Sequence, residues 1–479
     1  MPKRHQTDIR LDVDPGATRP APRPIEERNF HVALLADFRG RRGPGSPGAL
    51  QAVHVDRDEV DDVLARFAPT IRIGGAVAEG GVEVSFRELE DFHPDRLLER
   101  VPLFRAIREV AGGEAAGERP PPRRPAAPDA PVQDMLSGSV LDRIVDEQAT
   151  PDEGGGGAGA RDPLRRWVDQ LVEPHLVEEP DAEQVRVEAH VEELLAEGMR
   201  AVLRDPAFRR LEALWRGVDF LVRRLDTGPR LTIHLVDATR AELASEEGLG
   251  AFRELLDRGR RGEPWSVVAA LWDVGSSPEE LVLLRGMARL AAASGTALVA
   301  GAEAGLAGLS ELSRAGDRSA WGEPDRLWTA LRGEPEASSV TLALPRFLLR
   351  LPYGKEGEPC DALELEEIPG TPTRDDYLWG DAALPVALIL ARAFDQAGPD
   401  LLGALDPEVR SLPLHIHQAD GEPRATPCTE VALTHDDTDR FVDAGIMPFS
   451  WSRGSDAIRL VTLRSVASPP TRLAGPWRQ

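Results

Sequence analysis

Histidines and acidic residues gather near the C-terminus in a pattern that could hold a metal ion. His415 and His417 are two residues apart, so both side chains would lie on the same side of a strand. They are followed by His435, Asp436 and Asp437. Imidazole and carboxylate groups bind Zn²⁺ and similar ions, but these residues complete no known ligand spacing. The sequence therefore favours surface or half-buried histidines, and it predicts no metal.

A cysteine near one of these histidines raises the question of a thiol nucleophile. Cys428 precedes His435 by a short stretch, and a nucleophile needs both a base and a group that orients the base. No family signature surrounds Cys428, and no serine stands in a G-x-S-x-G motif. The chain has one other cysteine, Cys360, and two cysteines are too few for a disulfide framework. We therefore predict no catalytic residue.

Residues 43–48, GPGSPG, match the glycine pattern of dinucleotide-binding loops. Such a loop needs free backbone N–H groups and a helix that starts beside the pyrophosphate. Pro44 and Pro47 remove two of those donors, and residues 49–55 are typical of an extended segment. Asp56 lies further on, but the pattern indicates a flexible Gly/Pro loop, and we predict no cofactor.

Two arginines lie four residues apart among large apolar side chains. Arg346 and Arg350 belong to LPRFLLRLPYG, residues 344–354. One interpretation is an anion site, because guanidinium groups bind phosphate and carboxylate through paired hydrogen bonds. The other is a buried segment whose arginines make structural hydrogen bonds. The spacing favours the structural interpretation and leaves the anion site as the alternative.

The composition limits the classes of partner. The chain has 479 residues, 41% of them apolar, and a formal net charge of -24. This much negative charge repels a phosphate backbone, so nucleic-acid binding is not expected. The longest apolar run, residues 382–391, is about half of what a membrane span needs. The first residues carry no apolar leader, so we predict a cytoplasmic protein with no direct membrane insertion.

The pattern of apolar residues predicts two folded domains of the α/β class, with α+β character in places. Residues 30–110 indicate a small α/β domain that opens with an apolar strand at 30–36. Residues 162–467 alternate between helix and strand patterns. A near-continuous apolar strand at 265–271 and a capped helix that starts at Ser277 and Pro278 favour a doubly wound, mainly parallel sheet.

The remaining residues have the composition of arms and linkers. Residues 1–29 form a Pro-rich arm that contains one short strand with an apolar face of Ile9, Leu11 and Val13. Residues 111–161 form a linker around an amphipathic helix at 134–148, and residues 468–479 form a Pro-rich tail. Such a helix is marginally stable alone and is typical of a docking peptide. Its apolar face consists of Leu136, Val140, Leu141, Ile144 and Val145.

The larger domain resembles the large subunit (TssC or VipB) of the type VI secretion contractile sheath. The resemblance rests on residues 344–354 and on DDYLWGDAA at 375–383. FRRLEALWRG at 208–217 and the stretches at 264–284, 411–415 and 429–449 follow in the family's order. VLDRIVDE at 140–147 is similar to the family's N-terminal helix.

The smaller domain resembles the small sheath subunit (TssB or VipA). FHVALLADFRGR at 30–41 is similar to its first strand and loop, and FRELEDFHPDRLLERVPL at 86–103 to a later strand and helix. The chain thus looks like a fusion of two sheath subunits. The family's large subunit continues past the strand that ends near residue 466, so the resemblance also implies C-terminal truncation, because this chain ends at Gln479.

The resemblance implies a structural role and no enzyme activity. In this family, small and large subunits form a protomer that assembles helically around an inner tube above a baseplate. Ile9, Leu11 and Val13 would then add a strand to a neighbouring subunit's sheet. The helix at 134–148 would dock a ring-shaped AAA+ unfoldase ATPase. Self-association, or assembly with other sheath subunits, follows from the same role.

Two other functions stay open at this point. The chain could be a sheath paralogue that does not polymerise and acts as an adaptor, cap or regulator. An enzyme that holds a small ligand on its α/β sheet is the further alternative, although the motifs above give it no support.

Overall fold

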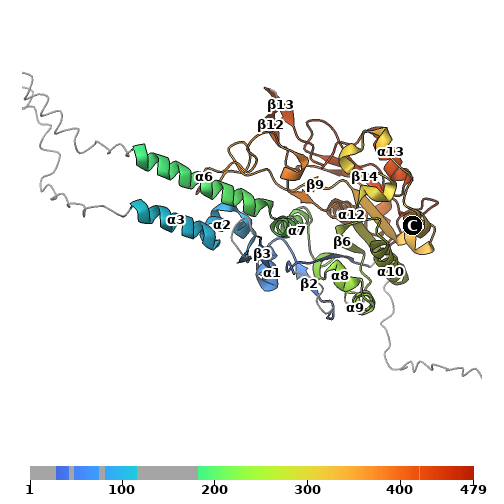
Figure 1. The fold of residues 1–479 in the computed structure, drawn as a ribbon. Coiled ribbons are helices and arrows are strands. Elements are labelled where there is room, and N and C mark those ends of the chain that lie inside the picture. The colour runs from blue at the N-terminus through green and yellow to red at the C-terminus, as the bar shows by residue number, and fades with distance from the viewer. Residues whose placement is uncertain are drawn as a thin grey trace, which may run out of the picture. The chain divides into compact units, whose positions relative to one another are not determined.

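The computed structural model describes residues 28–41, 48–74, 81–115, 182–260, 262–419 and 421–478 (Figure 1). These residues fall into two compact units. One unit contains residues 28–105 and 194–478, and it holds every strand named below. The other contains the described helical residues between 106 and 193. The predicted helix at 134–148 and the predicted strand at Ile9, Leu11 and Val13 lie outside the described residues.

One sheet of nine strands organises the larger unit. Its central strands are parallel to one another, and antiparallel strands close both edges. This confirms the predicted α/β class and the mainly parallel sheet. In spatial order the strands are β11 (Glu408–Val409), β15 (Ile458–Leu460), β14 (Met447–Trp451), β8 (Val340–Leu344), β7 (Ala297–Ala302), β6 (Val267–Val274), β1 (Phe30–Ala36), β5 (Leu231–Asp237) and β2 (Ala52–Val55).

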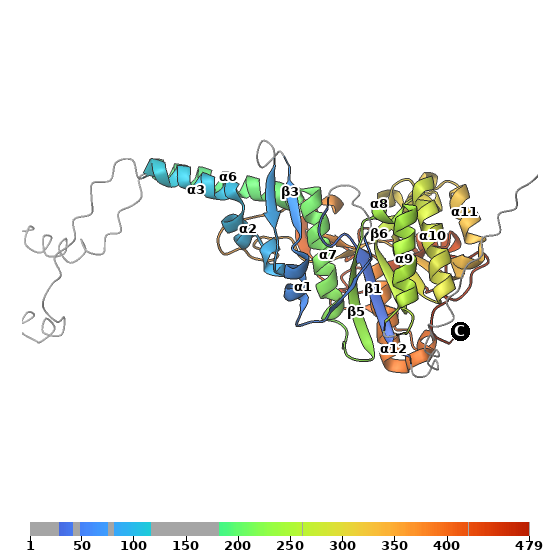
Figure 2. The same ribbon diagram turned by 90° about the horizontal axis from the view of Figure 1, so that it is seen from below.

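Helices cover both faces of this sheet (Figure 2). On one face Leu35, Val268 and Leu298 pack into a core with the helices α9 (Glu246–Arg258), α10 (Pro278–Ser294), α11 (Arg326–Arg332) and α13 (His435–Asp443). On the other face lies α12 (Ala383–Ala397), whose Phe394 stacks on Phe30 with ring centroids 5.0 Å apart. Helix α7 (Pro206–Val222) packs beside α12. Coverage of both faces explains why the central strands are apolar throughout.

Smaller elements surround the sheet. Three two-stranded ribbons pair β3 (Thr70–Ile73) with β4 (Val82–Ser85), β9 (Phe347–Leu348) with β10 (Trp379–Gly380), and β12 (Ile416–Ala419) with β13 (Glu422–Ala425). The remaining helices of the described chain are α1 (Val60–Phe67), α2 (Pro94–Arg100), α3 (Pro102–Ala115), α6 (Ala182–Arg204) and α8 (Arg240–Leu243).

Capping residues set the helix boundaries as the sequence indicates. Ser277 accepts a hydrogen bond from the Glu280 N–H at 3.3 Å, Pro278 occupies the first turn of α10, and Gly295 ends it with φ +69°. Asp91 lies in a short 3-10 turn, and His93 caps α2 because its Nδ1 accepts from the Asp95 N–H at 3.3 Å.

The Pro-rich tail contacts the sheet domain. Leu473 and Trp477 are 1% and 4% exposed, and the Trp477 ring lies 6.4 Å from that of Phe30. The Arg478 N–H donates to the carbonyl of Pro399 at 2.9 Å. Composition alone conceals this, because two apolar anchors suffice to dock a segment that is otherwise polar and rich in proline.

Candidate functional site

The site that bears on an assembly role is the join between the first segment (described residues 30–105) and the second segment (described residues 194–467). Strand β1 belongs to the first segment, yet it lies between β5 and β6 of the second and pairs with both in parallel. Its register places Val32 beside Ile233 on one side and Val267 on the other. All seven side chains of β1 are buried. The two segments therefore share one sheet.

Aromatic side chains extend the join along α7. The Trp215 ring lies 5.5 Å from Phe38 and 5.8 Å from Phe67, and all three side chains are buried. The indole N–H of Trp215 donates to the carbonyl of Phe38 at 3.2 Å. Two turns earlier in α7, Phe208 packs against Phe92 with ring centroids 5.8 Å apart. Truncation of a buried Phe or Trp side chain to alanine costs about 3–5 kcal/mol, so these side chains hold the two segments firmly together.

Polar groups of one segment are matched by partners in the other. Asp237, at the end of β5, accepts from the Phe38 N–H at 3.0 Å and pairs with Arg41 at 3.3 Å. Asp205 accepts from the Gly74 N–H at 3.0 Å while it also caps α7. Hydrogen bonds to a charged acceptor are stronger than neutral ones, and they fix the register of the two segments.

A buried ion network connects Glu212 of α7 to Arg350 and Glu367. The Arg350 guanidinium contacts Glu212 Oε1 at 2.7 Å and Glu367 Oε2 at 2.7 Å, and the three side chains are 5%, 0% and 8% exposed. Burial opposes ionisation of Glu212, but Arg350 and Arg216 outweigh it and lower the pKa of that carboxyl. Burial likewise opposes the charge on Arg350, yet Glu212 and Glu367 raise its pKa. The anion position beside Arg350 is thus filled by the protein's own carboxylates.

Comparisons with known proteins agree with this geometry. The sequence model of a family described as "VipB: EvpB/VC_A0108, tail sheath N-terminal domain" matches residues 186–250 and 258–467, which is more than half of the chain. The chain belongs to the VipB tail sheath family. A second model, described as "Type VI secretion system, VipA, VC_A0107 or Hcp2", matches residues 21–111. The predicted fusion of VipA-like and VipB-like segments is therefore confirmed.

One relative of known role matches the VipB-like part. The type VI secretion system sheath protein TssC1 of Pseudomonas aeruginosa is 25% identical over 289 residues, which is 56% of this chain. The chain spans 58% of the length of that relative. Membership of a sheath family agrees with the prediction of a structural protein rather than an enzyme. Among the described residues, no helix has the length and apolar character needed to cross a membrane.

The histidines considered as metal ligands in this sheath-family chain have other partners. The His415 Nδ1 lies 2.8 Å from the Tyr377 hydroxyl, and burial together with His417 lowers the pKa of His415. The ring of His435 is exposed on α13. Asp437 caps the same helix, where its carboxylate accepts from Thr434, and Asp436 pairs with Arg440. These contacts engage the Nδ1 atom of His415 and the carboxylates of Asp436 and Asp437.

The thiol of Cys428 is placed unfavourably for nucleophilic chemistry. Its Sγ donates to the carbonyl of Pro413 at 3.2 Å, and burial raises its pKa to about 11. Cys360 has its pKa raised to about 12, first by burial and then by Asp95. Because the thiolate is the reactive form, neither sulfur is activated.

The glycine-rich loop before β2 lies largely outside the described residues. Residues 42–47 are not described, whereas Gly48 leads into the strand β2 and not into a helix. The helix start that a pyrophosphate would need is therefore missing at Gly48, as the sequence predicts.

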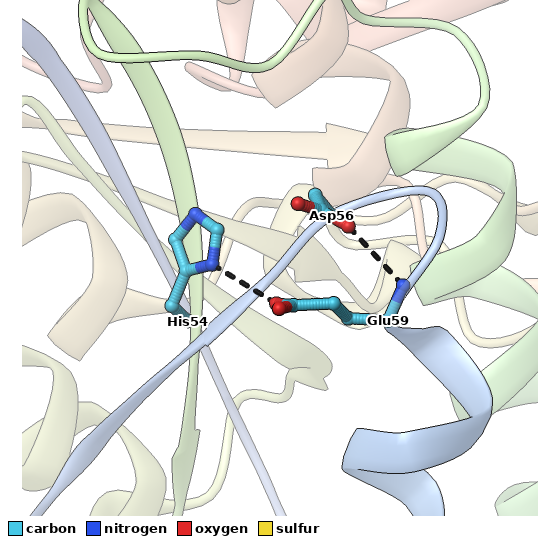
Figure 3. A group of neighbouring side chains, drawn as sticks. All are labelled: His54, Asp56 and Glu59. Carbon is cyan, nitrogen blue, oxygen red and sulfur yellow. Dashed lines mark hydrogen bonds and ion pairs between the residues drawn. The ribbon is translucent and has the colours of Figure 1, made fainter.

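A group of potential ligands that the sequence analysis did not single out lies after β2. The ligand atoms of His54, Asp56 and Glu59 lie within 4.8 Å of one another. Figure 3 shows the three side chains beside the turn that leads into α1. His54 Nδ1 is 3.3 Å from Glu59 Oε2, and Asp56 Oδ1 accepts from the Glu59 N–H at 3.1 Å. The spacing H-x-D-x-x-E could have been noticed in the sequence. The exposed ion pair and the turn before α1 explain the grouping, so we assign no metal to it.

The predicted partner-binding residues lie outside the described residues. These are the strand residues Ile9, Leu11 and Val13 and the helix residues Leu136, Val140, Leu141, Ile144 and Val145.

Proposed function

We propose that this chain is a structural component of a type VI secretion contractile sheath, in which the two fused segments act as one cytoplasmic protomer around an inner tube. The observation that carries the proposal is the position of β1 between β5 and β6. A protomer that must transmit force needs its two halves to move as one body. A shared sheet provides this, because separating the halves would break the backbone hydrogen bonds of β1 to both β5 and β6.

Assembly through the N-terminal arm is part of the proposal. The strand with Ile9, Leu11 and Val13 would pair with the sheet of a neighbouring protomer, since backbone pairing gives affinity and the apolar side chains give register. Other sheath subunits could serve as that neighbour, and a baseplate would seed the assembly. The supporting facts are the family membership and the alternation of apolar and charged residues at 8–13.

Electron microscopy and sedimentation of the full chain, alone and with the inner-tube protein of its own system, test this function. We expect tubes or rings for the wild type. The triple substitution Ile9→Asp, Leu11→Asp and Val13→Asp should abolish them with the melting temperature unchanged. Substitution of the other face, Arg10→Ala with Asp12→Ala, is the matched control. A monomer under all conditions would overturn polymerisation and favour a cap, adaptor or regulator.

The helix at 134–148 is proposed to dock the unfoldase ATPase. Leu141→Asp with Ile144→Asp should remove binding of the purified ATPase N-terminal domain in a pull-down, whereas Asp142→Asn on the opposite face should not. Equal binding by both variants would contradict this role and leave the sheath proposal intact.

A further inference from the structure

A cavity of about 820 Å³ lies at the carboxyl ends of β1, β5 and β6. Its lining includes residues of α7, residues that follow these strands, and residues 379–384 before and at the start of α12. It is thus built by both segments, and it differs from the filled ion network around Arg350.

The topology explains why the sheet is open here. Strands β1 and β6 are neighbours and pair as far as Leu35 and Ala270, where a register shift follows in β6. Beyond that point the chain leaves β1 toward β2 and leaves β6 toward β7, on opposite sides. Such a reversal leaves a crevice at the carboxyl edge of a parallel sheet, which is where open α/β sheets bind ligands.

The walls of the cavity are partly apolar and aromatic, and its charged groups are five carboxylates and four guanidinium groups. The apolar part includes Leu214, Leu271, Trp272 and Trp379. Aromatic faces attract cations as well as apolar groups. The carboxylates are those of Asp37, Asp205, Asp273, Glu303 and Asp381. Asp37 pairs with Arg41 and Asp205 caps α7, which leaves Asp273, Glu303 and Asp381.

Three of the four arginines in the lining are engaged by carboxylates outside it: Arg41 by Glu242, Arg240 by Glu280 and Arg346 by Glu430. The Arg346 Nη2 pairs with Glu430 Oε1 at 2.5 Å, and the Arg346 N–H donates to Glu430 Oε2 at 3.1 Å. Asp273 Oδ2 is 4.0 Å from Arg346 Nε. Asp381 accepts from the Ala383 N–H at 2.8 Å, but within the described residues no ion pair reaches its carboxylate. The Arg346 guanidinium therefore compensates little of the negative charge of Asp273 and Asp381.

The acidity of these groups agrees with a shortage of positive charge. Burial is the largest cause that raises the pKa of Asp273 to about 6; Arg346 opposes the rise, and Glu430 and Glu303 add to it. Burial and the neighbouring Asp273 also raise the pKa of Asp381. A bound cation would reverse these shifts, because an opposite charge within a few ångströms favours the ionised form.

We propose that this cavity binds a guanidinium or ammonium group between Asp273 and Asp381, with the attached alkyl chain against Trp272 and Trp379. The net charge of -24 attracts such a group over a longer range. The group could belong to a basic side chain of a neighbouring subunit or to a free small cation. The proposal does not depend on the sheath assembly proposed above, because it concerns binding to the isolated chain.

Calorimetric titration of the full chain with agmatine, an alkylguanidinium, tests the site. We expect binding at pH 7.5 that weakens at least tenfold in Asp273→Asn with Asp381→Asn. Neutral N-butylurea should not bind. The charge-matched control, Asp436→Asn with Asp439→Asn on α13, should bind like the wild type. Arg210→Gln should bind equally or more tightly, because it removes a cation from the lining.

Sedimentation velocity separates the two sources of the cation. Inhibition of self-association by agmatine and by the Asp273/Asp381 variant would identify a side chain of a neighbouring copy. Unchanged association, together with loss of agmatine binding in that variant, would identify a free cation. Failure of agmatine to bind the wild type, or equal binding by the wild type and the Asp273/Asp381 variant, would overturn the proposal.

Discussion

Arg346 and Arg350 lie four residues apart, but they belong to two different charged regions. Around Arg350, one guanidinium meets Glu212 and Glu367 at 2.7 Å each, and the pKa of Glu212 is lowered despite burial. Around Arg346, the guanidinium is held by Glu430, while the pKa of the neighbouring Asp273 is raised to about 6, chiefly by burial. The first region is neutralised from within, and the second has a surplus of acid.

The difference shows that proximity of opposite charges is not enough to stabilise a buried carboxylate. Contact distance and hydrogen bonding decide whether the pKa of the carboxyl is lowered or raised, because the attraction to the cation must exceed the loss of hydration. Glu212 has both, with Arg216 as a second donor at 2.8 Å. Asp273 has a single guanidinium at 4.0 Å. The first region is therefore suited to rigidity and the second to binding.

The largest expected effect comes from Arg350→Met. This change leaves Glu212 and Glu367 buried without their main partner, so the free energy of unfolding should fall by about 3–5 kcal/mol. Urea denaturation followed by circular dichroism measures it. A loss below about 1 kcal/mol would show that the network contributes little and would remove the contrast between the two regions.

Arg346→Met should have a smaller effect, a loss of about 1–3 kcal/mol. Glu430 loses one partner but keeps the backbone N–H of Arg346 at 3.1 Å, and the adjacent cavity admits water. The same denaturation experiment compares it with Arg350→Met. Equal losses for the two variants would contradict the distinction drawn between a filled and an open region.

Asp273→Asn should change the pH dependence of stability. Because the pKa of Asp273 is raised in the folded state, its ionisation destabilises the fold; the effect is absent below about pH 4, grows as the pH rises, and is complete above about pH 6. Relative to the wild type, the variant should therefore gain about 1–2 kcal/mol between pH 4.5 and 7.5, allowing for water in the cavity. Denaturation at both pH values measures this gain. If the variant instead lost stability relative to the wild type over this pH range, the pKa of Asp273 would be lowered in the folded state and not raised.

Arg285→Met should have the smallest effect and serves as the exposed reference. Arg285 pairs with Glu334 on the surface, and its side chain is 49% exposed. Exposed ion pairs contribute at most about 1 kcal/mol, so the free energy of unfolding should change by less than about 1 kcal/mol. A change as large as that of Arg346→Met would mean that burial does not determine how much each of the three arginines contributes to the free energy of unfolding.

Local patterns predicted the helix start at Ser277 correctly, because a cap depends on neighbours within three residues. The apolar run of β1 likewise predicted a buried strand. Its place between β5 and β6 could not be predicted, since its partners begin at residues 231 and 267 and no local pattern encodes parallel pairing over such separations. The cavity was missed for the same reason, because its lining comes from segments far apart in the chain.

The amino-acid sequence was enough to predict the α/β class from its apolar pattern, and the order of its motifs carried the resemblance to the sheath family. It favoured a structural role for Arg346 and Arg350, with an anion site as the alternative. Only the tertiary structure separated Arg350 from Arg346 and joined the two segments in one sheet. The physical reason is that desolvation and charge balance depend on which distant groups surround a side chain. Glu212 and Glu430 come from opposite ends of the second segment, and together with Glu367 and Asp273 they give the two arginines different environments.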